Sequence, residues 1–199
     1  MELNSFETIP TIRYKNLEHN YWYEHMGEDI LYLRINSCFE ETGKPVEEFT
    51  SQLVDDIKKL PEQAKVVIDF RGNIGGYPFF FDWEKVANSL NERKNLNTYI
   101  LIDEGCYSAG VIVPYSVKQL IKNSVLAGTP AGQNPNMCGS TREYVLPNSK
   151  YTVAISNYYT EFWPDYEYET LLPDITIYQT LEDYKQGTDT VLEAIKGME

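Results

Sequence analysis

The sequence lacks the features that would place it in several large classes of protein. Its three cysteines, Cys38, Cys106 and Cys138, are odd in number and show no CxxC spacing, so neither a disulfide framework nor a zinc site is expected. No apolar run reaches the ~18 residues that span a bilayer, so a transmembrane segment is not expected. No motif predicts a cofactor.

Targeting signals are also missing. The first residues, MELNSFETIPTIRYK, do not have the basic-then-apolar order of a signal peptide. We expect a cytoplasmic location if the sequence is complete. A secreted or envelope location is expected if it was cut from a longer precursor.

Positive charge is scarce. The sequence has 17 Lys and Arg residues against 30 Asp and Glu residues, which gives a formal net charge of −13. Such a chain repels phosphate backbones and has no basic run as a local exception, so nucleic acid is not an expected partner. Its 199 residues, 42% hydrophobic and 14% aromatic, are enough for one large globular domain.

Strands and helices are predicted to alternate along most of the chain. The polar, aperiodic start favours an irregular lead-in over residues 1–27, followed by one domain over 28–199. The apolar run KVVIDF is typical of a strand buried on both faces. Strands are predicted at 30–35, 65–70, 98–103, 124–128 and 171–177, a hairpin at 142–147 and 151–156, and helices at 45–60, 83–90, 109–121 and 190–197. This order predicts an α/β fold with a mixed, largely parallel core sheet flanked by helices.

Two glycine-rich turns, each after a predicted buried strand, are the most informative motifs. The first is RGNIGG, in which Gly75 and Gly76 can adopt positive φ angles and turn their N–H groups toward an anion. The second is EGCYSAG, which places Ser108 at a junction between a strand and a helix. The N-terminus of a helix offers unpaired N–H groups and a partial positive charge.

This layout suits acyl transfer. An acyl-transfer enzyme needs a nucleophilic hydroxyl with hydrogen-bond donors beside it for the oxyanion of the transition state. From the residues alone a structural interpretation stays open, because serine is also a favoured helix N-cap. RGNIGG is not the GxxxxGK[ST] pattern of a phosphate-binding loop, so a nucleotide site is not favoured.

An ordered series of segments resembles the catalytic domain of the tail-specific, or C-terminal-processing, serine peptidases, with features of the tricorn core. The series covers residues 28–197 and reads YLRIN, VVIDFRGNIGG, ILIDEGCYSAG, VLAGTPAGQ, YVLPNSKYTV and LLPDITIYQTLEDYKQGTDTVLEAI. The resemblance implies the crotonase-like (ClpP/crotonase) superhelical fold. It also implies hydrolysis of a polypeptide, although no PDZ domain of the kind these peptidases usually carry is recognisable.

The resemblance assigns most of the catalytic residues. It makes Ser108 the nucleophile, and the N–H groups of Ala109 and of Gly75 or Gly76 the oxyanion hole. It places an assisting carboxylate at Glu167. The substrate it implies is an extended polypeptide, paired edge-on with a strand near the site.

The general base departs from the family pattern. The tail-specific peptidases carry a lysine 25 residues after the serine, where this chain has Gln133, and the tricorn histidine corresponds to Arg34. A glutamine and an arginine cannot act as bases at neutral pH. Four substitutes remain open, ranked with the histidines first because only imidazole titrates near neutral pH without help. They are His25, ranked first, then His19, and after them Lys118 and Lys150 without an order between the two.

Two other functions stay open at this point. A peptidase-like domain that has lost its base would serve as a peptide-binding or scaffold module. A crotonase-like acyl-CoA enzyme would keep the two oxyanion donors without a nucleophile, but the closing segment of the series belongs to the peptidases.

Overall fold

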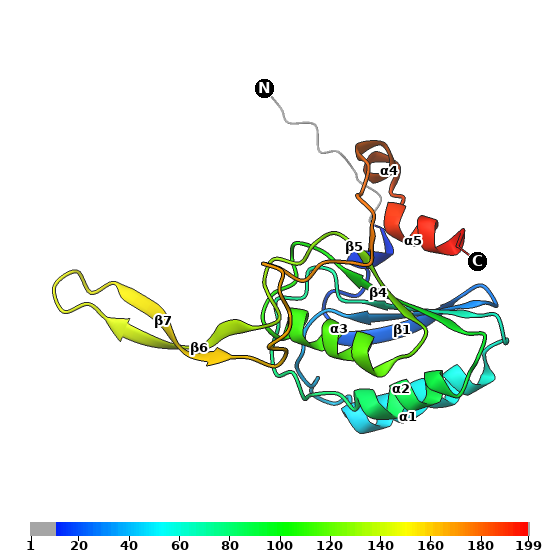
Figure 1. Ribbon diagram of the computed structural model, residues 1–199, viewed down its shortest axis with the longest axis horizontal. Coiled ribbons are helices and arrows are strands. Elements are labelled where there is room, and N and C mark those ends of the chain that lie inside the picture. Colours follow the sequence, from blue (N-terminus) through cyan, green and yellow to red (C-terminus); the bar gives the residue numbers. More distant parts are fainter. Residues whose placement is uncertain (1–10, 199) are drawn as a thin grey trace.

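The computed structural model describes residues 11–198 and has a six-stranded sheet at its centre (Figure 1). The strands lie in the order β1-β2-β3-β4-β5-β8. They span Tyr21–Met26 (β1), Ile30–Ile35 (β2), Lys65–Asp69 (β3), Asn97–Ile102 (β4), Ser124–Gly128 (β5) and Ile175–Thr176 (β8). Strand β1 is antiparallel to β2, and the other neighbours pair in parallel. The predicted α/β fold with a mixed, mostly parallel sheet is confirmed.

Helices cover both faces of this sheet. On one face lie α1 (Val46–Lys59), α2 (Trp83–Asn91) and α3 (Ala109–Leu120), and on the other lies α5 (Thr190–Lys196). Successive residues of β3 alternate between the two cores, with Val66 and Ile68 in the first and Val67 in the second. This burial on both faces explains why the central strands read as continuous apolar runs.

The element boundaries correct the sequence interpretation in three places. Strand β1 lies within 1–27, where an irregular lead-in is expected; it has a single partner strand, and its register buries Tyr21 fully. The strand expected over 171–177 shrinks to β8, since Pro173 precedes it. The short helices η1 (Ile12–Tyr14) and α4 (Leu181–Gln186) are not predicted from the sequence. The part of the lead-in over residues 1–10 lies outside the described residues.

A second, two-stranded sheet projects from the body of the molecule (Figure 1). It consists of β6 (Met137–Val145) and β7 (Thr152–Thr160), joined by a short turn. We call β6, β7 and their turn the ribbon. The predicted hairpin is confirmed, with longer strands than the sequence indicates.

Candidate functional site

Ser108 lies at the N-terminus of α3, just after the carboxyl end of β4. Its side chain is exposed, and its backbone has φ 54° and ψ −127°. Residues other than glycine rarely adopt positive φ, and such conformations gather at functional sites. The turn resembles the sharp strand-to-helix elbow that presents a nucleophilic serine in α/β-hydrolases.

The diglycine turn packs directly against this serine. A Cβ atom built on Gly75 would lie 2.8 Å from the Ser108 Cβ and 3.0 Å from the Ala109 nitrogen. Gly75 also has a φ of +109°. Only glycine fits here, because a side chain would both clash and strain the backbone.

Gly76 approaches a third segment equally closely. A Cβ atom on Gly76 would lie 2.4 Å from the carbonyl oxygen of Cys38, and its φ is +137°. The Cys38 N–H donates to the Gly75 carbonyl at 2.9 Å, and the Tyr77 N–H donates to the Cys38 carbonyl at 2.7 Å. The segment after β2 therefore holds the diglycine turn in place beside Ser108.

Two backbone donors beside Ser108 are free to bind an anion. Within residues 11–198 neither the Ala109 N–H nor the Gly76 N–H has a hydrogen-bond acceptor. The Gly75 N–H is already engaged, since it donates to the side-chain oxygen of Asn73 at 2.8 Å. Of the two glycines proposed from the sequence, Gly76 is thus the one whose N–H is available.

Asn73 connects the three segments around the site. The buried side-chain amide of Asn73 donates to the backbone carbonyl of Ile35, at the end of β2, at 3.0 Å. The backbone carbonyl of Asn73 accepts the Tyr107 N–H at 3.0 Å. Gly110 lies against it so closely that a Cβ there would approach the Asn73 carbonyl to 2.0 Å. Sequence reasoning does not assign Asn73 a role, although its place within RGNIGG is the signal that could have done so.

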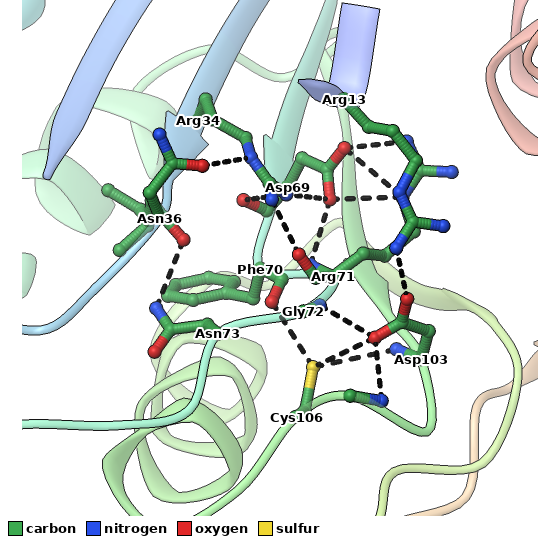
Figure 2. Close-up of polar contacts among 12 residues, drawn as sticks. Arg13, Arg34, Asn36, Asp69, Phe70, Arg71, Gly72, Asn73, Asp103 and Cys106 are labelled. Atoms are coloured by element: carbon green, nitrogen blue, oxygen red, sulfur yellow. Dashed lines mark hydrogen bonds and ion pairs between the residues drawn. The ribbon is translucent and has the colours of Figure 1, made fainter. Parts of the chain in front are cut away.

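Asp103 links the two glycine-rich turns (Figure 2). One carboxylate oxygen accepts the N–H groups of Gly72 at 2.7 Å and Gly105 at 3.0 Å, and the other pairs with Arg13 at 2.6 Å. Cys106 lies beneath the loop, where its thiol donates to the Phe70 carbonyl at 3.2 Å. Burial raises the pKa of Cys106 to about 12, which makes it an inert packing residue.

A buried ionic network fixes the start of the RGNIGG turn (Figure 2). Asp69, at the end of β3, pairs with Arg34 at 2.8 Å and with Arg71 at 2.6 Å, and Arg71 also pairs with Asp189 at 2.7 Å. Burial opposes ionisation of Asp69, but the guanidinium groups of Arg71 and Arg34 outweigh it and hold its pKa well below its ordinary value. Arg34 is thus a structural ion-pair partner.

Gln133 occupies the neighbourhood of Ser108 where the resemblance expects a lysine. Its side-chain oxygen accepts the Ser108 backbone N–H at 2.9 Å. An amide cannot take up the hydroxyl proton, so Gln133 orients the turn rather than activating the nucleophile.

The two histidines lie at opposite ends of the sheet. His25 is exposed on β1 opposite Leu31, at the amino ends of the parallel strands, with its Nε2 4.0 Å from an Asp56 oxygen. His19 lies at the carboxyl ends of the parallel strands, the same end of the sheet as Ser108. Its backbone carbonyl accepts the Asn36 side-chain N–H there at 2.7 Å. Of the two histidines, His19 is therefore the one that shares an end of the sheet with Ser108.

The remaining candidate bases and the assisting carboxylate are also separate from Ser108. Lys118, in the last turn of α3, pairs with Asp174 at 2.8 Å, and Lys150 is exposed in the turn of the ribbon. Glu167 is exposed in the loop after β7, a loop whose Leu171 N–H donates to the Gln133 carbonyl at 3.1 Å. Among residues 11–198, no hydrogen bond or ion pair connects Ser108 to a histidine, a lysine or a carboxylate.

Exposed apolar side chains surround the serine and the diglycine turn. The exposed fractions of Ile74, Tyr77 and Phe79 are 76%, 59% and 69%, and Tyr107 beside the serine is 46% exposed. Phe39, next to the Cys38–Gly76 contact, is 56% exposed. Several large apolar side chains exposed beside the serine favour a binding surface here.

Neither a metal centre nor a membrane-spanning helix is found among residues 11–198. Across the described part of the chain, no group of three His, Cys, Asp or Glu side chains is placed to hold a metal ion. None of the helices in that part is both long and apolar enough to cross a bilayer.

Comparisons with known proteins bear on the fold. Neither protein-family models nor curated protein sequences match this chain. Among solved structures, a proposed peptidase from Parabacteroides merdae ATCC 43184 aligns with a TM-score of 0.58 at 19% identity, over 91% of this chain and 66% of that one.

Two further peptidase structures match. The tricorn protease aligns with a TM-score of 0.51 at 17% identity, over 83% of this chain and 17% of that one. The photosystem II D1 C-terminal processing protease aligns with a TM-score of 0.50 at 15% identity, over 86% and 53%. This chain spans less than two thirds of the length of each of the three structures. At these identities the comparisons show that the chain shares the fold of C-terminal-processing and tricorn-type peptidases.

Proposed function

We propose that this protein is a serine-type peptidase that hydrolyses polypeptides through an acyl-enzyme formed on Ser108. The observation that carries the proposal is the contact between the Ser108 elbow and the diglycine turn, with free N–H groups at Ala109 and Gly76. The proposal includes the crotonase-like form of the α/β fold and the tail-specific peptidases as the family of origin.

The reaction follows from this geometry. The Ser108 Oγ attacks the carbonyl carbon of a peptide bond, and its proton passes to a base. The oxyanion that forms accepts hydrogen bonds from the Ala109 and Gly76 N–H groups. The C–N bond then breaks as the amine takes up the proton, and water hydrolyses the ester to release the acid and the free serine.

His19 is the base that the placement of the side chains favours. Its Nδ1 lies 2.7 Å from a carboxylate oxygen of Glu41 and donates to it, which leaves Nε2, 3.9 Å from a Glu18 oxygen, as the nitrogen that would take up the hydroxyl proton. Hydrogen bonds from His19 and Asn20 outweigh partial burial and lower the pKa of Glu41, which keeps its carboxylate ionised. The imidazole has to approach Ser108 for proton transfer, as catalytic contacts commonly tighten only when substrate binds.

The apolar surface around Ser108 supports a polypeptide substrate. Ile74 directly precedes the two glycines, Tyr77 and Phe79 follow them, and Tyr107 directly precedes the serine; all four side chains are exposed. An extended chain lying across this surface would bring a peptide carbonyl to the two free N–H groups.

A second function, a peptide-binding module without catalysis, is favoured by one observation. Gln133 stands where the resemblance expects the lysine base, and its side chain is hydrogen-bonded to the Ser108 N–H. Such a module would keep the apolar surface and the two donors but would not form an acyl-enzyme.

Labelling with a fluorophosphonate, followed by intact mass and peptide mapping, tests the proposal. Attack by the Ser108 Oγ forms an O–P bond and expels fluoride, and we expect stoichiometric modification that disappears in Ser108→Ala. Ser140→Ala is the matched control, because Ser140 is also exposed with a positive φ of 51° but lies in the ribbon. Absence of labelling at every pH tested, or labelling that persists in Ser108→Ala, would contradict the peptidase and favour the binding module.

The same assay separates the candidate bases. We expect His19→Ala to reduce the labelling rate at least about tenfold, the lower end of a general-base contribution. His25→Ala is the control and should leave the rate unchanged, since His25 lies at the far end of the sheet. An unchanged rate in His19→Ala would rule out His19 without affecting the assignment of Ser108.

A further inference from the structure

The ribbon has one apolar face that lies open to solvent. Cross-strand pairs place Tyr144 opposite Val153 and Arg142 opposite Ile155, and the Leu146 N–H donates to the Tyr151 carbonyl at 2.9 Å. Because side chains two apart on a strand share a face, these pairs lie on the same side of the ribbon. We call the five apolar residues of this side that lie nearest the turn the ribbon face: Tyr144, Leu146, Tyr151, Val153 and Ile155.

The ribbon face is exposed although it is apolar. The exposed fractions are 50% for Tyr144, 74% for Tyr151 and 52% for Ile155. Over the same stretch the opposite side carries Thr141, Glu143, Thr152, Ala154 and Ser156, with Val145 as its one large apolar residue. Nearer the body of the molecule, Tyr158 pairs with Gly139 and also lies on that side. No helix or other strand within residues 11–198 makes an extensive contact with β6 or β7. The two sides of the ribbon therefore differ as the buried and solvated sides of a sheet do.

A two-stranded ribbon with an exposed apolar face needs a partner that covers this face permanently. An isolated hairpin is marginally stable in water, and three or more strands or a packed face are needed for independent stability. A polypeptide substrate would come and go with turnover and leave the face bare in between. We propose instead that the ribbon face is the contact through which two copies of this chain pair, about a two-fold axis.

The charge distribution favours a second copy at this place. The whole chain carries a formal net charge of −13, so two copies repel one another over most of their surfaces. Residues 137–160 contain Arg142, Lys150 and one acidic residue, Glu143. The ribbon is thus a segment where two copies can approach without strong repulsion.

The area is sufficient for a reversible dimer. At these exposed fractions, two tyrosines and three aliphatic side chains present roughly 500 Å² per copy. A symmetric pair would bury about 1,000 Å², the lower bound of biological interfaces. Two hydrogen bonds connect the chain segments on either side of the ribbon. The Asn136 side-chain nitrogen donates to the Trp163 backbone carbonyl at 2.6 Å, and the Asn136 side-chain oxygen accepts the Trp163 backbone N–H at 2.9 Å.

Sedimentation velocity of the full chain, from about 1 to about 100 μM, tests the proposal in the range expected for such an interface. We expect a monomer–dimer equilibrium in this range. The double variant Tyr144→Ser/Ile155→Ser should raise the dissociation constant at least about tenfold. Val145→Ser is the matched control: Val145 is 64% exposed but lies on the opposite side, and its loss should leave the dissociation constant unchanged.

Two results would overturn the proposal. One is a monomer at every concentration, which would mean that the ribbon face does not pair two copies and binds a different partner, such as a polypeptide substrate. The other is a Val145→Ser variant that weakens pairing as much as the double variant, which would contradict the assignment of the face. Ser108→Ala should pair like the unaltered chain, so the result is independent of the proposed peptidase activity.

Discussion

The side of Gly75 that faces Ser108 has no room for a side-chain atom. Gly75→Ala would place a methyl group 2.8 Å from the Ser108 Cβ at a φ of +109°. We expect it to lower the free energy of unfolding by more than about 2 kcal/mol, from backbone strain and overpacking together, and to abolish labelling of Ser108. Urea unfolding and intact mass measure the two effects.

Gly43 provides the matched control for this substitution. Its φ of +80° is also positive, but it lies nearer the left-handed region that side chains can adopt, and nothing lies within 4 Å of a Cβ built there. Gly43→Ala should therefore cost about 1 kcal/mol and leave labelling unchanged. If the two substitutions lower the free energy of unfolding and the labelling of Ser108 equally, the diglycine turn does not pack tightly against Ser108.

Asp69 is the residue whose charge holds the carboxyl end of β3. Asp69→Asn leaves Arg34 and Arg71 buried beside a neutral group, and we expect a loss of about 3–5 kcal/mol in urea unfolding. Glu193→Gln is the control, because its pair with Lys196 is on the surface and should contribute less than about 1 kcal/mol. A loss below 1 kcal/mol in Asp69→Asn would contradict the role of the buried network.

The same residue predicts a pH dependence of stability. The pKa of Asp69 is lower in the folded protein than in the unfolded chain, so the folded state binds the proton less readily. Its contribution is complete above an unfolded pKa of about 3.9 and is lost as the pH falls below that value. Unfolding free energies measured from pH 6 to pH 3 should fall less steeply in Asp69→Asn than in the unaltered chain.

Helix α5 is attached to the sheet through its N-cap residue, Asp189. Asp189 caps the helix by accepting the Leu192 N–H at 3.1 Å and also pairs with Arg71. Asp189→Ala removes both interactions and should cost about 3–5 kcal/mol, whereas Asp189→Asn keeps the cap and should cost less.

The N-cap of α4 separates capping from ion pairing. Thr180 accepts the Asp183 N–H at 3.0 Å on an exposed helix. Thr180→Ala should therefore cost about 1 kcal/mol in the same urea unfolding experiment. If Asp189→Ala costs no more than Thr180→Ala, the attachment of α5 through Arg71 is energetically unimportant.

At the scale of elements, sequence patterns predicted the buried parts well and the marginal parts poorly. Strands β2 to β5 and helices α1 to α3 follow from apolar runs and helical spacing because each is packed on the core. Strand β1 was missed because its alternation is masked by aromatic residues on both sides, and α4 because it has no buried residue.

The site was predictable only as far as it depends on local backbone. Ser108 and the diglycine turn follow from their places after two buried strands. The order of His25 and His19 could not be predicted, because the register of β1 against β2 decides which end of the sheet each one occupies. The role of Asn73 depends in the same way on contacts among three segments that are distant in the sequence.

The excess of negative charge is a property of the whole molecule. If the ribbon face pairs two copies by apolar burial, raising the salt concentration from about 20 to about 300 mM screens the repulsion between them and should lower the dissociation constant several-fold. Sedimentation at the two salt concentrations measures the change. A dimer that weakens with salt would instead be held by ion pairs.

A co-crystal structure with a peptide boronate would reveal whether Ser108 is a nucleophile beside an oxyanion hole, because boron forms a tetrahedral adduct with a nucleophilic serine. We predict a bond from the Ser108 Oγ to boron and one boronate oxygen about 3 Å from both the Ala109 and Gly76 nitrogens, the distance expected of oxyanion-hole donors. A boronate that is not bonded to Ser108, or whose oxygens point away from both N–H groups, would contradict the account.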